Sequence, residues 1–153
     1  KPAAHLTCVA ATREEIDDMF RINVLSTVHL CQAVARGMAA RQRGHIIVMT
    51  SIAAKEIFTF GSVYSATKAA MSVIAQSMRL ELRAANVKVT EVRTGAVATA
   101  VHDRQRHPAV LAWLGKRRLK PMSADQVAAI IVQTLAAPEI VCTDLIELKP
   151  LGS

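Results

Sequence analysis

One tyrosine and one lysine stand four residues apart in this 153-residue chain. Tyr64 is the only tyrosine, and Lys68 follows it at the spacing that puts two side chains on one face of a helix. An ammonium group beside a phenol favours the phenolate and lowers the pKa of the tyrosine toward neutral pH. Such a phenol can act as a general acid or base on an alcohol or a carbonyl. The spacing alone leaves open the alternative that the pair arose by chance.

Two further polar residues lie where a ligand site is expected. Ser51 directly follows the apolar run HIIVMT, and it stands thirteen residues before Tyr64. Ligands of open α/β sheets bind at the carboxyl ends of parallel strands, so Ser51 is a candidate for the same site. Asn23 lies inside a long helical pattern, where asparagine is a poor helix former. Either a ligand role or a local kink with its own hydrogen bond would explain that asparagine.

The elements that must position these residues alternate between helices and strands. Apolar residues recur at threes and fours in the helical segments, whereas the strand segments are short apolar runs rich in β-branched residues. Capping boxes at Thr12 and Ser123 mark two helix starts. The pattern predicts helices over residues 12–40, 63–84 and 123–137, and strands over 45–50, 87–92 and 144–149. Strands separated by helices indicate parallel βαβ units, so the expected fold is a doubly wound α/β sheet.

Composition narrows the class of protein. Hydrophobic residues make up 52% of the chain, and aromatic residues only 3%, so we expect one globular domain with an aliphatic core. The formal net charge is +7, and six Lys and Arg side chains against one Asp lie within residues 102–120. That segment is interpreted as a solvated basic stretch, an anion-attracting rim over a ligand site or, least favoured, a nucleic-acid surface. Three widely spaced cysteines favour neither a disulfide framework nor a zinc site, and indicate a cytoplasmic protein.

Taken together, these residues make the sequence recognisable. Ser51, Tyr64-Ser65-Ala66-Thr67-Lys68 and Asn23-Val24 resemble the Asn–Ser–Tyr–Lys tetrad of the short-chain dehydrogenase/reductase family. The surrounding sequence is similar to that family from about Thr12 to Pro150. The carboxyl-terminal segment resembles the family's NADP-preferring members that act on small hydroxy acids and related alcohols. The turn TG at Thr94 and Gly95 departs from the family's usual Pro-Gly, and Ala54 replaces a usual glycine.

The resemblance implies a role for each residue. Tyr64 would be the acid/base of an alcohol–carbonyl interconversion, and Lys68 would lower its pKa and hold the nicotinamide ribose. Ser51 would bind the substrate oxygen together with Tyr64, and Asn23 would hold a water in a proton relay. The nicotinamide amide would lie against the turn after the strand, at Gly95, Val97 and Thr99. The implied cofactor is NAD(P), with NADP favoured, and no metal is expected.

The glycine-rich turn of a dinucleotide site has no counterpart in the sequence. The six glycines stand at positions 37, 44, 61, 95, 115 and 152, so no G-x-G-x-x-G variant is possible. The expectation is therefore that residues 1–153 are the carboxyl-terminal part of one Rossmann-like dehydrogenase domain, with a substrate loop at 99–120 and the first βαβ half absent. In that loop, Trp113 and the cations Arg104, Arg106, Arg117 and Arg118 are expected to shape or cover the substrate.

Three functions follow from this sequence. The favoured one is an alcohol dehydrogenase or carbonyl reductase acting on a small molecule. The alternatives are a non-catalytic fragment or interaction subunit that retains the fold, and a basic anion-binding module. In the family, the helices corresponding to 12–40 and 63–84 form the interface between subunits, which implies a homodimer or homotetramer. Neither a nucleic acid nor a membrane is an expected partner.

Overall fold

The strands form one parallel sheet. The computed structural model describes residues 8–100, 108–116 and 120–151. Its strands are β1 (Gly44–Ser51), β2 (Val87–Thr94) and β3 (Leu145–Leu148), which pair in the order β1-β2-β3. Both pairings are parallel, and the register sets Ser51 opposite Thr94 and Thr94 opposite Leu148. The predicted Rossmann-like arrangement of helices and parallel strands is confirmed.

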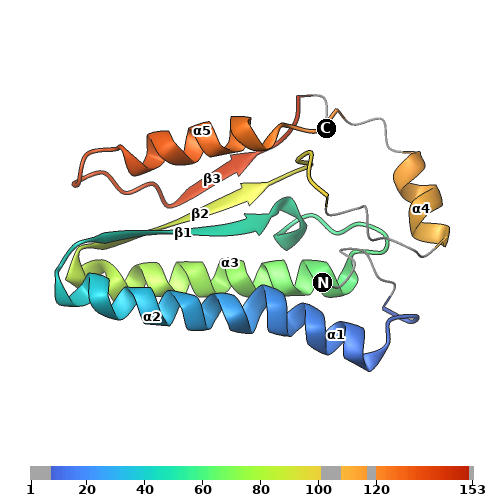
Figure 1. Cartoon of the computed structure of the whole chain (residues 1–153), viewed down its shortest axis with the longest axis horizontal. Helices are drawn as coiled ribbons and strands as arrows, with labels where there is room; N and C mark the ends of the chain where they lie inside the picture. Colours follow the sequence, from blue (N-terminus) through green and yellow to red (C-terminus); the bar gives the residue numbers. More distant parts are fainter. Residues whose placement is uncertain (1–7, 101–107, 117–119, 152–153) are drawn as a thin grey trace.

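Helices cover both faces of this sheet. As Figure 1 shows, α2 (Ser26–Ala40) and α3 (Ser62–Leu82) lie against one face, whereas α5 (Ala124–Leu135) lies on the other. The short helix α4 (Pro108–Gly115) stands apart, beyond the end toward which the strand arrows point. No helix in the described part of the chain is long and apolar enough to cross a membrane.

The first predicted helix is one run of chain with three parts. Thr12 caps α1 (Arg13–Phe20), its side chain accepting from the Glu15 N–H while Glu15 accepts from the Thr12 N–H. A π-helical segment, Arg21–Leu25, then joins α1 to α2. π-Helical turns inside α-helices are rare and occur often at functional sites. The run ends at Ala40, as the pattern predicts, and Gln42 then adopts a left-handed φ of 54° before Gly44 begins β1.

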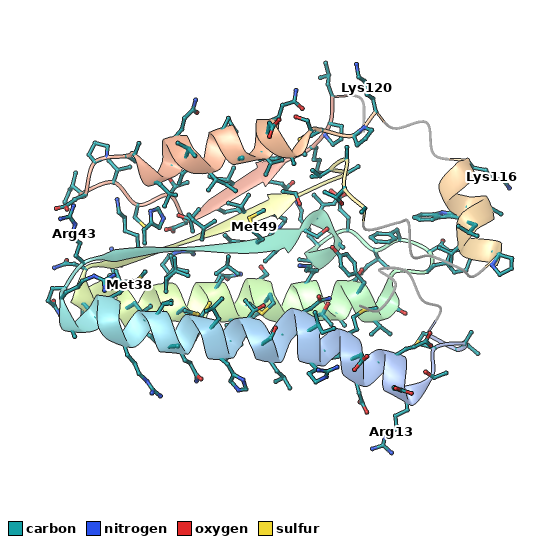
Figure 2. All side chains as sticks on the ribbon, in the orientation of Figure 1. Arg13, Met38, Arg43, Met49, Lys116 and Lys120 are labelled. Atoms are coloured by element: carbon teal, nitrogen blue, oxygen red, sulfur yellow. The ribbon has the colours of Figure 1, made fainter. Side chains whose placement is uncertain are left out.

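The core lies between the sheet and the helices α2 and α3. Val48 and Val89 project from neighbouring strands onto Met71 and Ala75 of α3, and all four are 2% exposed or less. At the amino end of β1, the side chain of Met38 packs against Gly44, where the chain passes from α2 to β1; Met38 is labelled in Figure 2. Burial of these aliphatic side chains fixes α3 against the middle of β1 and β2.

His45 gives this fold a dependence on pH. Its ring Nε2 lies 2.8 Å from Thr90 Oγ1, and burial, followed by the charge of Lys88, lowers the pKa of His45 from 6.5. The unfolded chain therefore takes up the proton first, so the stability due to neutral His45 is complete above about pH 6.5 and falls below it. We expect His45→Gln to flatten the loss of unfolding free energy between about pH 7 and 5, measured by urea denaturation. The exposed His29→Gln variant is the control, and an unchanged acid slope in His45→Gln would contradict this prediction.

Candidate active site

A cleft of about 560 Å³ opens at the carboxyl ends of β1 and β2. Its walls come from the end of β1, the start of α3, the turn after β2 and one side of α5. Six of the seven predicted site residues line it: Ser51, Tyr64, Lys68, Gly95, Val97 and Thr99. Asn23 is not among the lining residues. The fold thus gathers residues that are up to 48 positions apart in the sequence, from Ser51 to Thr99.

Ser51 and Tyr64 both line this cleft, and the Ser51 hydroxyl acts as a hydrogen-bond partner that lowers the pKa of Tyr64. Ser51 ends β1 and caps a short 3-10 helix, where its Oγ also accepts from the Ala53 N–H at 3.2 Å. The cap holds the side chain, which is only 9% exposed, at the mouth of the cleft. Tyr64 reaches it from the first turn of α3. A carbonyl oxygen placed beside both hydroxyls would meet two hydrogen-bond donors at once.

Lys68 lies one helical turn from Tyr64, as its spacing predicted. Its Nζ is 5.7 Å from the centroid of the Tyr64 ring and donates to the carbonyl oxygen of Met49 at 3.4 Å. Burial lowers the pKa of Lys68. Among the described residues, the Met49 carbonyl is the one hydrogen-bond acceptor of Lys68 Nζ. Two of the three N–H donors of the ammonium group are therefore left for a ligand.

The pKa of Tyr64 moves in the direction opposite to the one expected. Burial raises it from 10.0, and the hydrogen bond from Ser51 opposes that rise without cancelling it. The spacing of Tyr64 and Lys68 predicts instead that the neighbouring ammonium group has the largest effect on the pKa of Tyr64. In the structure the removal of the phenol from water outweighs every group that favours its anion. Tyr64 is therefore a neutral phenol in this cleft, which is the form that can donate a proton.

Asn23 lies in the π-helical segment and contacts the back of α3. Its Nδ2 donates to Thr67 Oγ1 at 3.1 Å, and Thr67 Oγ1 donates to the backbone oxygen of Tyr64 at 2.7 Å. Thr67 is fully buried. Asn23 is thus linked through the Thr67 hydroxyl to the turn of α3 that carries Tyr64. Thr67 was not among the predicted site residues.

The turn after β2 forms the wall opposite α3. The Gly95 N–H donates to the Leu148 carbonyl at 2.7 Å, and Val97 forms a parallel bridge with Met122 through the neighbouring groups Ala96 O and Ala98 N. Peptide groups alternate along an extended chain, so the N–H and C=O of Val97 point away from Met122. This turn therefore presents a backbone donor and a backbone acceptor on one residue of the cleft.

Aromatic residues at the cleft entrance were only partly anticipated. Phe58 lines the cleft, and the ring of Trp113 on α4 stacks on it with centroids 5.8 Å apart. Phe60 meets Trp113 edge-on and has a φ of 65°, an uncommon conformation for a bulky side chain. Sequence reasoning singled out Trp113 as shaping the site but not its partners, since no local pattern links residue 58 to residue 113. The predicted cations Arg104, Arg106, Arg117 and Arg118 lie outside the described residues.

We expect a spectroscopic titration to report this environment directly. Tyr64 is the only tyrosine, so the ultraviolet absorbance of tyrosinate measures its pKa without interference from another phenol. Ser51→Ala removes the hydrogen bond that opposes the effect of burial, and should raise the pKa of Tyr64 further. Ser62→Ala, an exposed position on the first turn of α3, is the matched control and should leave the pKa unchanged. A lower pKa in Ser51→Ala would contradict the geometry of this pair.

Comparison with known proteins identifies the class to which this fold and cleft belong. The family model for short chain dehydrogenase matches residues 5–109, and the chain therefore belongs to the short-chain dehydrogenase family. An uncharacterized oxidoreductase of Staphylococcus aureus (strain USA300) is 30% identical to it over 138 residues, covering 90% of this chain and 56% of the relative. The chain thus spans about half the length of the curated relatives it matches.

Solved structures agree with that assignment. A short chain dehydrogenase/reductase family protein superposes with a TM-score of 0.79 at 27% identity, over 96% of this chain and 61% of that one. The closed form of a serine dehydrogenase complexed with NADP+ superposes with a TM-score of 0.84 at 24% identity, over 96% of this chain and 60% of the other. At that identity the second likeness establishes the fold.

Proposed function

We propose that this chain carries the catalytic part of an NAD(P)-dependent oxidoreductase that interconverts an alcohol and a ketone or aldehyde. The observation that carries the proposal is that Ser51, Tyr64 and Lys68 line one cleft bounded by β1, β2 and α5, with Lys68 one helical turn from Tyr64. Membership of the short-chain dehydrogenase family supports it, and so do relatives that are named oxidoreductases.

Each of the three residues has a task in the proposed reaction. Tyr64, held as a neutral phenol, donates its proton to the carbonyl oxygen during reduction, and takes it back from the alcohol during oxidation. Ser51 donates to the same oxygen and stabilises the charge that develops on it. Lys68 stabilises the Tyr64 phenolate left behind, because an ammonium group beside a phenolate favours the charged form.

The residues at the cleft also fit the nicotinamide end of the cofactor. A ribose presents hydroxyl groups to the Lys68 ammonium, and a carboxamide needs one donor and one acceptor, which the backbone of Val97 provides. The hydroxyl of Thr99 lines the same wall. When bound there, the cofactor supplies or accepts the hydride. NADP is proposed over NAD because two similar proteins form complexes of this kind, a serine dehydrogenase with NADP+ and an alcohol dehydrogenase of Thermococcus sibiricus with 5-hydroxy-NADP.

We propose further that residues 1–153 correspond to the carboxyl-terminal part of a Rossmann-like domain. The chain matches 56–61% of the length of the relatives and solved structures considered above. Its glycines offer no G-x-G-x-x-G turn for a pyrophosphate. In this proposal, the cleft of these 153 residues binds the nicotinamide end of the cofactor on its own. The βαβ units that bind the pyrophosphate and adenosine are not among these residues, and they add to the affinity.

The reaction is tested by following NADPH and NADH consumption with a panel of aldehydes and ketones. The panel should pair anionic with neutral substrates, because the basic segment at 102–120 predicts a lower KM for the anionic member of each pair. The proposal expects carbonyl-dependent oxidation of at least one nucleotide. Nucleotide consumption that does not depend on any carbonyl would count against it.

The compartment proposed for this enzyme is the cytoplasm. Cys8, Cys31 and Cys142 are all free thiols in the structure, and two of them are exposed. Exposed free thiols are typical of proteins kept in a reducing environment.

A second copy of the chain is the proposed partner of α2 and α3. Val73 and Leu80 stand seven residues apart on the outer side of α3 and are 65% and 73% exposed, and Leu30 on α2 is 64% exposed. Apolar side chains grouped on neighbouring helices are typical of subunit interfaces. We expect Leu80→Glu to shift sedimentation toward the monomer, whereas Val9→Glu, at a still more exposed apolar position before α1, leaves it unchanged. A wild-type chain that is strictly monomeric at micromolar concentration would contradict the interface.

A further inference from the structure

A buried carboxylate lies beneath the cleft, where the three segments that carry the candidate site meet. Glu91 on β2 is 1% exposed, and both of its oxygens are fully used. Oε1 accepts from Thr50 Oγ1 at 2.6 Å and from Arg93 Nε at 3.1 Å. Oε2 accepts from Ser72 Oγ at 3.0 Å and from Arg93 Nη2 at 3.2 Å. We call Thr50, Ser72, Glu91 and Arg93 the Glu91 cluster.

Each member of the cluster adjoins one part of the site along the chain. Thr50 directly precedes Ser51, and Ser72 is one helical turn after Lys68 on the face of α3 that meets the sheet. Arg93 lies two residues before the turn at Gly95 and also donates to Glu147 on β3 at 3.3 Å. The cluster therefore connects β1, β2, β3 and α3 at the level where the cleft begins.

The interface between α3 and the sheet changes from aliphatic contacts to hydrogen bonds at the level of the Glu91 cluster. Farther from the cleft it consists of aliphatic side chains such as Val48, Val89 and Met71. Aliphatic contacts are non-directional and tolerate small sliding movements, whereas charge-assisted hydrogen bonds fix both distance and direction. A buried ion pair adds little net stability compared with apolar residues of the same size, but it restricts the arrangements that its partners can adopt.

We propose that the Glu91 cluster is a positioning device that sets the distance between Ser51 on β1 and the Tyr64–Lys68 face of α3. The inference concerns the residues of the proposed active site, and so its catalytic meaning rests on the proposed function. Thr50 and Ser72 act through Glu91: one holds the strand end, and the other holds the helix. When either hydroxyl is lost, the hydrogen bond between Ser51 and Tyr64 weakens without any change in the charge of the protein.

The test is the tyrosinate titration of the full chain with no cofactor or substrate present. Thr50→Val and Ser72→Ala remove one hydroxyl each, and we expect each to raise the pKa of Tyr64 by about half a pH unit, toward its value in Ser51→Ala. Thr50→Ser keeps the hydroxyl and should restore the wild-type pKa. Thr90→Val is the matched control, because the Thr90 hydroxyl is also buried, next to Glu91 on β2, but donates to Thr143 O and contacts His45, both outside the cluster.

The outcomes are distinct. An unchanged pKa of Tyr64 in both neutral variants, or an equal rise in Thr90→Val, would overturn the inference. So would failure of both Thr50→Val and Ser72→Ala to fold, because the cluster would then be a folding element. In a carbonyl reduction assay the neutral variants should lower kcat more than they raise KM. A Tyr64 shift in a chain with no activity would uphold the positioning role while the proposed function fails.

Discussion

Tyr64→Phe is expected to lower kcat/KM for carbonyl reduction by about 100- to 10,000-fold, the range that general acid–base catalysis contributes. The substitution removes the phenolic hydroxyl of Tyr64, and with it the proton to be donated, and leaves the aromatic ring in place. Packing at the start of α3 should therefore persist, and cofactor affinity should change little because Lys68 remains. Steady-state kinetics with the best carbonyl substrate of the panel, combined with a thermal unfolding curve, measure both parts of this expectation.

A matched substitution separates loss of chemistry from loss of a hydroxyl group in general. Thr134→Val on α5 removes a hydroxyl that donates to the Ile130 carbonyl at 2.8 Å, and Thr134 is not among the residues that line the cleft. We expect near wild-type kcat/KM from this variant. Activity that survives Tyr64→Phe would show that another group moves the proton and would remove Tyr64 from the role assigned to it.

The second large effect concerns stability. Arg93→Met leaves the carboxylate of Glu91 buried without its cation, since the two side chains are only 11% and 2% exposed. Breaking a buried pair in this way costs about 3–5 kcal/mol of unfolding free energy. Urea denaturation monitored by circular dichroism gives the value directly. A loss below about 1 kcal/mol would mean that Glu91 finds other partners or water in the variant.

Two further variants show whether the charge of Glu91 is the cause. The double variant Glu91→Leu/Arg93→Met removes both charges, and we expect it to recover much of the lost stability, because apolar replacements of a buried pair are often neutral. Arg43→Met breaks an ion pair with Glu139 at 2.9 Å in which both partners are more than three-quarters exposed. That control should cost no more than about 1 kcal/mol. A double variant as unstable as Arg93→Met alone would contradict the argument.

Local sequence signals predicted the elements of this fold well. Thr12 and Ser123 were selected as helix caps from their spacing to Glu15 and Gln126, and both capping boxes form with the expected hydrogen bonds. The apolar run before Ser51 is the strand β1, whose Ile46 and Val48 are buried on the side of α2 and α3, whereas Met49 is 43% exposed. These signals work because capping and periodicity depend on residues within one or two turns of each other.

The features that the sequence did not reveal depend on contacts between distant residues. A glutamate in a strand is usually exposed, yet Glu91 is buried because Thr50 and Ser72 supply donors from 41 and 19 residues away. The direction of the Tyr64 pKa shift likewise depends on how deeply the fold buries the phenol, which spacing to a lysine does not show. The segment at 99–120 was treated as a loop, whereas α4 forms within it and holds Trp113 against Phe58.

Titration of the full chain with NADPH and NADH, followed by nicotinamide fluorescence, tests the central claim most directly. The account predicts saturable binding of at least one nucleotide, weakened about tenfold or more in Lys68→Met, because a hydrogen bond from a charged donor is lost. Lys55→Met, which removes an exposed lysine paired with Glu147, should bind as the wild type does. Binding of neither nucleotide, or binding unaffected by Lys68→Met, would contradict the claim that this cleft holds the nicotinamide beside Tyr64.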